Sequence, residues 1–289
     1  MKPDLVTRLD TRSLGDRLVV LSPHLDDAVL SLGGTIARAS RAGTEVTVVT
    51  VFAGDPESTA EAGEWDTMCG FSTAGEAARE RRREDARACE ILGAVPEWLP
   101  FPDIDYVRGE RKDQIWPALA RSLTGADFVF VPGFPLEHPD HAWLMCLVLE
   151  HVPATMALGL GLYVEQPYAD MRVLGRGYSL DTLGLTLRIA LRRPGARRLQ
   201  QPTLDGTVPE SVASRLDWIA APVGRSERSA KNEALRAYSS QLPQFSNRLL
   251  PRLRLYEWCW GGEGVGLVRS PAHRRDLVSS SDHDSDPTN

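Results

Sequence analysis

The chain has 289 residues and a formal net charge of −6, and 42% of its residues are hydrophobic. This length suits one large domain, and the negative charge disfavours binding to nucleic acid, which is itself a polyanion. The four cysteines are scattered without the paired spacing of a zinc knuckle or a redox motif, so we expect a reducing, cytoplasmic location. We also expect no secretory signal and no membrane span, because no segment reaches roughly 18 apolar residues.

Strands and helices alternate along the first half of the sequence. Short apolar runs predict strands, and runs with a period near 3.6 residues predict helices. In chain order we expect strands at 17–21, 45–52, 98–101 and 127–131, with helices at 26–42, 76–92 and 113–123. This alternation is typical of a parallel sheet covered on both faces. The sequence therefore predicts an α/β, Rossmann-like fold with a mostly parallel sheet and helices on both faces.

The remaining segments are less regular. Residues 54–75 lack a sustained period and form a long loop that could cover a site. Gly33 and Gly34 are expected to let the first helix pack closely on the sheet. Beyond residue 161 we expect an elaborated C-terminal part with strands at 162–164 and 184–191 and a helix at 225–239, whose order we do not predict. We predict one domain over residues 1–278, followed by a polar, disordered tail at 279–289.

Two motifs rich in histidine and aspartate follow two of the predicted strands. Ser22–Asp27 comes directly after the first strand, and Glu137–His141 comes after the strand at 127–131. In parallel sheets ligands collect at the carboxyl ends of the strands. We therefore expect the two motifs to meet at one edge of the sheet, around a metal ion.

The residue types in these motifs suit metal-assisted hydrolysis. His24, Asp27 and His141 could bind zinc, which needs a few nitrogen or oxygen ligands and an open position for water. Asp26, next to a ligand, could take a proton from the water and pass it to a leaving amine. His138, one helical turn from His141, could stabilise an oxyanion as an imidazolium. Iron or another divalent ion would suit the same ligands, and either aspartate could instead only cap the helix that follows.

The two motifs also carry a family resemblance. Pro23-His24-Leu25-Asp26-Asp27 resembles the Pro-His-Pro-Asp-Asp signature of the LmbE-like, or PIG-L, superfamily of zinc-dependent N-deacetylases, and His138-Pro139-Asp140-His141 is similar to its second signature. The resemblance implies zinc binding by His24, Asp27 and His141, with Asp26 as the general base. It further implies that His138 is an electrostatic or acid group and that Asp140 orients the site. Leu25 and Ala28 replace the usual Pro and Glu, a variant that we associate with deacetylases of glycosylated natural products.

The resemblance extends to patches outside the motifs. Arg81, in the basic start of a helix, and Asp103, after the next strand, match positions that hold substrate hydroxyls in the family. An ordinary surface charge and a turn aspartate are the alternative interpretations. Lys231–Gln241 resembles a C-terminal Lys…Ser-Gln segment. Trp65, in the long loop, could stack on a sugar or be buried beneath the loop.

Together these features predict a metal-dependent hydrolase that removes an N-acetyl or other short acyl group from an amino sugar or a glycosylated natural product. One alternative is an amidase that acts on a larger amide, such as a thiol conjugate or an N-acyl amino acid intermediate. Another is a catalytically silent metal- or sugar-binding protein of the same fold. We expect a small-molecule partner and make no prediction of the oligomeric state.

Overall fold

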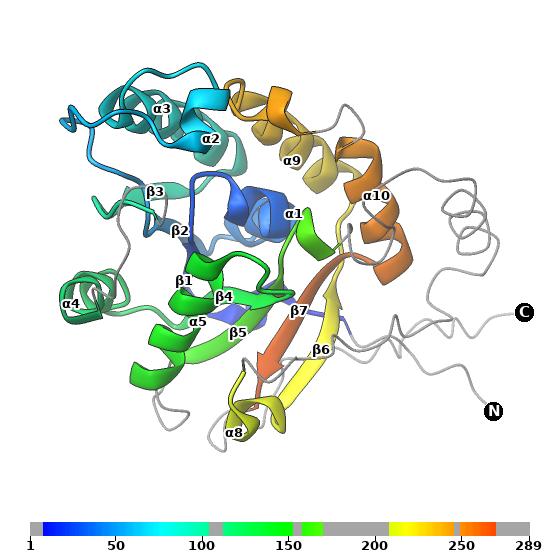
Figure 1. Ribbon diagram of the computed structural model, residues 1–289. Helices are drawn as coiled ribbons and strands as arrows, with labels where there is room; N and C mark the ends of the chain where they lie inside the picture. The colour runs from blue at the N-terminus through cyan, green and yellow to red at the C-terminus, as the bar shows by residue number, and fades with distance from the viewer. Residues whose placement is uncertain (1–7, 104–111, 153–157, 170–207, 246–248, 270–289) are drawn as a thin grey trace, which may run out of the picture.

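The protein is built around a mixed sheet of seven strands, in the order β3-β2-β1-β4-β5-β7-β6 (Figure 1). The computed structural model describes residues 8–103, 112–152, 158–169, 208–245 and 249–269. The strands are β1 (Arg17–Ser22), β2 (Glu45–Thr50), β3 (Val95–Trp98), β4 (Phe128–Phe134), β5 (Gly159–Val164), β6 (Leu216–Ala221) and β7 (Glu263–Val268). The first five strands pair in parallel, whereas β7 runs antiparallel to both β5 and β6. The predicted α/β, mostly parallel fold is therefore confirmed.

Helices cover both faces of this sheet (Figure 1). They are α1 (Asp27–Arg41), α2 (Glu64–Met68), α3 (Ala74–Leu92), α4 (Lys112–Ser122), α5 (Pro139–His151), α8 (Glu210–Ala213), α9 (Arg225–Ala237) and α10 (Leu249–Trp260), with short 3-10 helices at Thr11–Leu14 and Leu242–Gln244. One buried cluster joins the sheet to α1, α3, α9 and α10, and a second joins it to α4, α5 and α8. The central strands are therefore buried on both sides, as expected for a parallel sheet.

Most of the helices and strands predicted in the first half lie within a few residues of the observed ones, but the strand predicted at 98–101 is wrong. The observed β3 begins three residues earlier and pairs with β2 from Val95 onward. It is an edge strand, and Val95 is 57% exposed. Its apolar signal is therefore weak, while Leu99, within the predicted range, is buried just after the strand ends.

The segment predicted as a long irregular loop, 54–75, contains helix α2. Glu61 and Thr73 form an isolated bridge that closes the segment on itself. Thr73 also caps α3, because its hydroxyl accepts the Glu76 N–H while the Glu76 carboxylate accepts the Ser72 N–H. Gly93 ends α3 with a φ of 74°, as predicted for a C-terminal glycine.

The C-terminal part adds elements that the sequence did not reveal, namely β6, α10 and β7. The predicted helix at 225–239 is confirmed as α9. The predicted strand at 184–191 and the predicted tail at 279–289 lie outside the described residues. No helix in the described ranges combines the length and the apolar character needed to cross a membrane.

The glycines of α1 face the C-terminal part rather than the sheet. A Cβ atom on Gly33 would lie 2.9 Å from Cγ of Lys231 in α9, and one on Gly34 would lie 2.8 Å from Val223. The expectation of close packing is therefore right, but the partner is wrong. Two small residues in sequence permit a close approach without showing which neighbour makes it.

A buried ion cluster fixes this contact. Lys231 Nζ donates to Glu263 at 2.6 Å and to Glu257 at 2.8 Å. The Glu263 carboxylate also accepts the backbone N–H groups of Gly34 and Thr35, each at 2.8 Å. Burial disfavours a charge on Lys231, but the two carboxylates outweigh that effect and raise its pKa. The cluster therefore ties α1 to α9, α10 and β7.

We expect Lys231→Met to lower the free energy of unfolding by about 3–5 kcal/mol, because it leaves two buried carboxylates without their cation. Urea denaturation measures this loss. Arg83→Met is the control, since Arg83 is 74% exposed and pairs with Glu80 only at the surface; its effect should stay below about 0.5 kcal/mol. Equal losses in the two variants would contradict a stabilising role for the cluster.

Candidate metal centre

The two motifs meet at the point where the strand order reverses. From β1 the chain moves outward to β2 and β3, whereas β4 returns to the other side of β1 and continues to β5. β1 and β4 are therefore neighbours, with Leu18 opposite Phe128 and Val20 opposite Phe130. Loops leaving such strands diverge to opposite sides and open a crevice at the carboxyl edge. Both motifs begin at this edge of the sheet, as predicted.

The turn between β1 and α1 is shaped by its own polar groups. The Ser22 hydroxyl donates to the His24 carbonyl at 2.6 Å and accepts the Ala28 N–H at 3.0 Å. The His24 N–H in turn donates to Oδ2 of Asp27 at 2.9 Å. These bonds bring the first residues of the motif into a tight loop, so that His24 and Asp27 face the same point.

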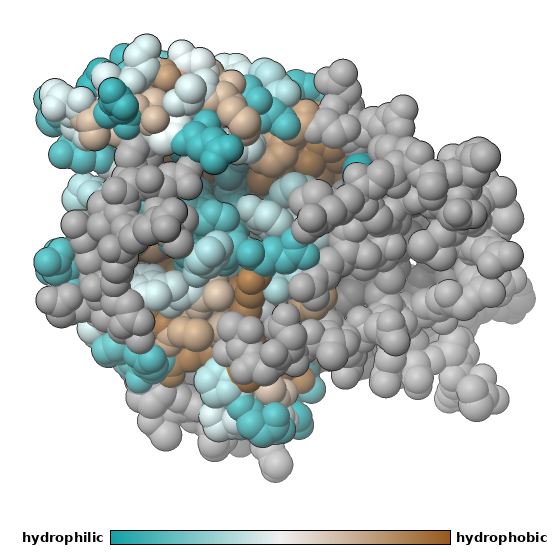
Figure 2. Space-filling view, in the orientation of Figure 1, coloured by the Kyte–Doolittle hydropathy of each residue, from teal (hydrophilic) through white to brown (hydrophobic). Residues whose placement is uncertain are grey.

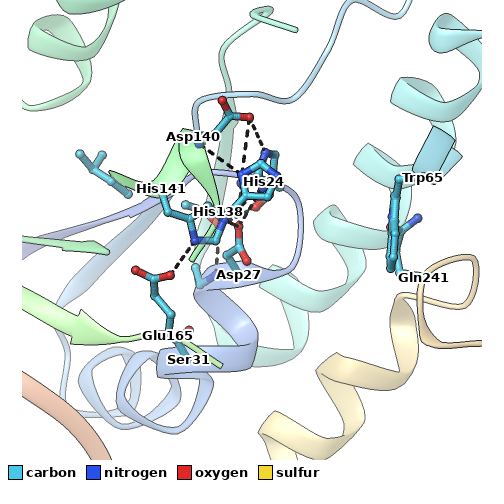
Figure 3. A network of polar contacts seen from close by, with 12 residues as sticks. His24, Asp27, Ser31, Trp65, His138, Asp140, His141, Glu165 and Gln241 are labelled. Atoms are coloured by element: carbon cyan, nitrogen blue, oxygen red, sulfur yellow. Dashed lines mark hydrogen bonds and ion pairs between the residues drawn. The ribbon is translucent and has the colours of Figure 1, made fainter. Parts of the chain in front are cut away.

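One carboxylate oxygen of Asp27 lies between the histidines of the two motifs (Figure 3). Asp27 Oδ2 is 3.3 Å from Nδ1 of His24 and 3.1 Å from Nε2 of His141. The two ring nitrogens are themselves 3.3 Å apart. His141 is fully buried and Asp27 is 5% exposed, so this triangle lies inside the protein.

These separations suit a shared metal ion. Ligands about 2.0–2.1 Å from a tetrahedral zinc ion lie about 3.3 Å from one another. The three atoms of the triangle match that spacing. A wider group of His24, His138 and His141 could also hold a metal ion, since its ligand nitrogens lie within 4.8 Å of one another. The triangle that contains Asp27 is the tighter set and provides a carboxylate to balance the charge of the cation.

Each histidine of the triangle has a carboxylate behind it. His24 Nε2 lies 3.0 Å from Oδ2 of Asp140, and His141 Nδ1 lies 2.8 Å from Oε2 of Glu165. Histidines that bind metals usually donate their second N–H to such a carboxylate, which fixes the tautomer and the ring orientation. Asp140 thus orients His24 directly, whereas its nearest oxygen is 3.9 Å from His138.

Sequence reasoning missed Glu165 and Tyr168, which follow β5 at the same edge of the sheet. Glu165 is 1% exposed, and the Tyr168 ring meets His141 edge-on with the ring centroids 5.5 Å apart. The signal was present, because a strand was predicted at 162–164 and Glu165 stands directly behind it. The rule that identified the two motifs would have identified this third strand end as well.

The carboxylates also decide the charge of the two histidines. Burial disfavours the charged ring of His24, but hydrogen bonds with Asp140 and Asp27 outweigh it and raise the pKa to about 9. Burial likewise opposes a charge on His141, and Asp27 and Glu165 together raise its pKa to about 10. Because a metal ion binds the neutral ring, a cation at this site must compete with protons.

Asp26 has a strained backbone at the first turn of α1. Its φ is 127°, a region that residues with a side chain rarely adopt, and its side chain makes no capping hydrogen bond. Such strain costs on the order of 1–3 kcal/mol and is typical of active sites. Burial and the neighbouring Asp27 raise the pKa of Asp26. Asp26 therefore does not act as a helix cap and favours binding of a proton.

His138 begins helix α5 and borders the triangle. Its Nδ1 accepts the Asp140 N–H at 3.2 Å, so in the neutral ring the proton is on Nε2. Burial and the nearby rings of His24 and His141 lower the pKa of His138 to about 4. The structure therefore favours a neutral N–H donor at this position rather than the imidazolium that we expected.

The side chains of the site are reached from one face of the protein. The side chain of His24 is 14% exposed and that of His138 is 31% exposed, so access is from the side of His138. Figure 2 shows hydrophilic surface at the centre of this face, where β4 and α5 meet in Figure 1.

Arg81 lies beside the site within α3. It is 8% exposed, and its Nη1 lies 3.1 Å from Asp66 of α2. Burial disfavours its charge, but Asp66, Asp26 and Asp103 outweigh that effect and raise its pKa. Arg81 is therefore not an ordinary surface charge, and Asp103 lies close enough to affect its pKa.

Trp65, in the predicted loop, is half-buried against Phe245, with 5.7 Å between the ring centroids. This packing favours burial of Trp65 over stacking on a sugar.

The fold and the site together define a class: an α/β protein with a candidate metal centre at its switch point. Residues 19–152 match the model of the PIG-L family, described as GlcNAc-PI de-N-acetylase. This match confirms the resemblance to the PIG-L superfamily. The matched region contains both motifs and all three residues of the triangle.

Individual relatives extend this comparison. The chain is 30% identical over 140 residues to diacetylchitobiose deacetylase from Thermococcus kodakarensis, covering 47% of this chain and 49% of that protein. It is 27% identical over 182 residues to 2'-N-acetylparomamine deacetylase from Streptomyces fradiae, covering 54% and 59%. The chain thus spans about half the length of the curated relatives that it matches.

Solved structures match over a larger share of the chain. A triple mutant of a deacetylase involved in the teicoplanin biosynthetic pathway has a TM-score of 0.64 and 27% sequence identity. The match covers 88% of this chain and 98% of that one, so it includes the C-terminal elements beyond the family model.

We expect Glu165→Gln to weaken metal binding by about 10–100-fold, because the neutral amide lacks the negative charge that the carboxylate places behind His141. Competition with a chromogenic chelator measures the affinity. Glu137→Gln is the control, since Glu137 is exposed at the same edge of the sheet. If Glu165→Gln binds metal as tightly as the unmodified protein, Glu165 does not support the metal centre.

Proposed function

We propose that this protein is a metal-dependent hydrolase that removes an acetyl or other short acyl group from the amine of an N-acylated amino sugar, free or within a glycosylated natural product. The observation that carries the proposal is the carboxylate of Asp27 held between His24 and His141, with Asp26 strained and buried beside it. A metal site next to a carboxylate that can accept a proton is the arrangement that amide hydrolysis needs.

The relatives support the substrate class. Those named above are a diacetylchitobiose deacetylase, a 2'-N-acetylparomamine deacetylase and a deacetylase from the teicoplanin pathway. The first two names contain an N-acetylated amino sugar. We infer that this chain acts on the same kind of bond, and that its partner is a small molecule rather than a nucleic acid.

We assign His24, Asp27 and His141 as the metal ligands. A divalent ion bound by these residues would polarise the amide carbonyl and lower the pKa of water. Two nitrogens and one carboxylate oxygen suit Zn2+, and Fe2+ is accepted by the same set. We propose zinc, and we further propose a cytoplasmic location in view of the free thiols of Cys69 and Cys89.

In this proposal Asp26 carries out the proton transfers, and His138 stabilises the negative charge that develops. Asp26 takes a proton from the attacking water as the new C–O bond forms at the carbonyl carbon. His138 donates its Nε2–H to the oxygen that becomes negative. Asp26 then gives the proton to the nitrogen as the C–N bond breaks, which releases the acid and the free amine. Asp140 is a positioning residue, because it touches His24.

We also assign Arg81 and Asp103 to substrate binding. The buried Nε of Arg81 has no hydrogen-bond partner among the described residues. An unpaired buried donor is costly, and an oxygen of the substrate would satisfy it. Asp103 carries a charge that acts on Arg81. A hydroxyl group between them could donate to the carboxylate and accept from the guanidinium.

We expect Asp26→Asn to lower the rate of acetate release by about 10²–10⁴-fold while the bound metal remains, because the amide cannot carry the proton. The measurement is acetate release from a panel of N-acetylated amino sugars and glycosylated natural products, with metal content determined on the same samples. His141→Ala is the comparison variant and should lose metal and activity together. A chelator should abolish release, and added zinc should restore it.

Full activity of Asp26→Asn would contradict the assigned general base. A wild-type protein that holds one metal ion per chain but releases no acetate from the panel would contradict the proposed substrate class. In that case the larger-amide and binding-only alternatives would take its place.

We expect Arg81→Lys to raise KM by about tenfold with little change in kcat, because lysine keeps the pairing with Asp66 but lacks the Nε donor. Steady-state kinetics on the best substrate of the panel measures both constants. Arg83→Lys, two residues along the same helix and exposed, is the control. A decrease in kcat alone would place Arg81 in the chemical step rather than in binding.

A further inference from the structure

The turn that follows α9 is fastened to α3 by two buried carboxylates. Glu84 accepts hydrogen bonds from the Ser239 hydroxyl, the Ser240 N–H and the Ser240 hydroxyl, at 2.8, 2.6 and 2.7 Å. Asp85 accepts the Tyr238 hydroxyl at 2.7 Å. Hydrogen bonds to ionised carboxylates are among the strongest in proteins. The backbone of this turn is therefore held rigidly against α3.

The turn presents Gln241 to helix α2. Gln241 is fully buried, and its amide donates to the Ser240 hydroxyl at 2.8 Å. Its Oε1 accepts the indole N–H of Trp65 at 2.6 Å, 176 residues away in sequence. Figure 3 shows this pair between α2 and the turn, apart from the histidines. The neighbouring Gln244 donates to the Met68 carbonyl at 2.8 Å.

Helix α2 depends on these contacts for its position. It has five residues and no side-chain cap at its start. A helix this short is not stable by itself in water. The contacts of Trp65 and Met68 lie at its two ends and both come from the turn region, so they fix the helix where it lies.

Asp66 follows Trp65 in α2, but it pairs with Arg81 of α3, whereas Trp65 bonds to Gln241 of the turn. Asp66 is 5% exposed and lies 3.1 Å from Nη1 of the guanidinium. Asp66 thus holds one edge of Arg81 and leaves Nε without a partner among the described residues. A shift of α2 would move Asp66 and release the guanidinium.

We propose that Trp65 and Gln241 are positioning residues for substrate binding: they fix α2 so that Asp66 holds Arg81 with its Nε free for an oxygen of the substrate. This inference rests on the proposed function, because it assigns Arg81 its substrate contact. It gives the C-terminal turn a role in recognition at a site whose proposed metal ligands and general base come from the first half of the chain.

The test uses Trp65→Phe, which removes the N–H donor and keeps a ring against Phe245. Trp98→Phe is the matched control, since the indole N–H of Trp98 donates to Asp85 of α3 at 2.8 Å in the same network, whereas that of Trp65 donates to Gln241. Hydrogen–deuterium exchange is measured over residues 64–71. Trp65→Phe should speed exchange there by about tenfold, and Trp98→Phe should leave it unchanged.

Kinetics then shows whether the fixed helix serves Arg81. Trp65→Phe should raise KM about fivefold or more with kcat unchanged, and Trp98→Phe should not. In an Arg81→Lys background, Trp65→Phe should add no further change in KM, because both substitutions remove the same contact. Fully additive effects, or equal KM values for the two tryptophan variants, would overturn the proposal.

The two measurements separate this inference from the proposed function. Unchanged exchange in Trp65→Phe overturns the inference whatever the activity. Faster exchange with an unchanged KM also overturns it, while acetate release by the wild-type protein still supports the proposed function. A wild-type protein that releases no acetate contradicts the proposed function and, with it, the substrate role of Arg81, even if exchange shows that the contact fixes α2.

Discussion

The parallel pairing of β1 with β4 is the constraint on which the site depends. It sets the ends of two strands side by side at the switch point of the sheet, although they lie more than a hundred residues apart in sequence. A slip of two residues in this pairing would shift His24 relative to His141 by about 6.6 Å, since each residue of a strand advances about 3.3 Å. The alternation of Val19 and Val20 between the two buried clusters opposes a slip of one residue. Core packing thus fixes the distance between the two motifs.

The buried charges of the site follow one pattern. Asp27 faces both histidines, while Asp140 and Glu165 stand behind them, so each ring is in contact with two carboxylates. Among the described residues no histidine forms an ion pair with Asp26, which takes the strained backbone conformation. Carboxylates that are one residue apart in sequence therefore differ in character, because one is stabilised as an anion and the other is buried beside an anion. This difference is what lets one bind a cation and the other carry a proton.

The elements from α9 onward support the site without supplying its proposed metal ligands or its proposed general base. The cluster of Lys231, Glu257 and Glu263 fixes the middle of α1, whose first turn carries Asp26 and Asp27. The turn at 238–241 is bonded to α3 and, through Gln241, to α2. Strain at a functional residue persists only where the surroundings hold it in place. These contacts provide such surroundings, and they explain why the motifs of the first half need the rest of the chain.

The sequence by itself determined the alternation of strands and helices, the two motifs and the residues within them, and the end of α3 at Gly93. All of these depend on near neighbours, since periodicity, capping and motif spacing are properties of short segments. Only the tertiary structure decided that Glu165 stands behind His141, that Gly33 meets Lys231, and that Trp65 bonds to Gln241. It also placed β3 at Val95–Trp98, where an exposed edge leaves little apolar signal. A buried polar group needs a partner, but any donor or acceptor of suitable geometry can provide it, so the partner is decided only when distant segments pack together.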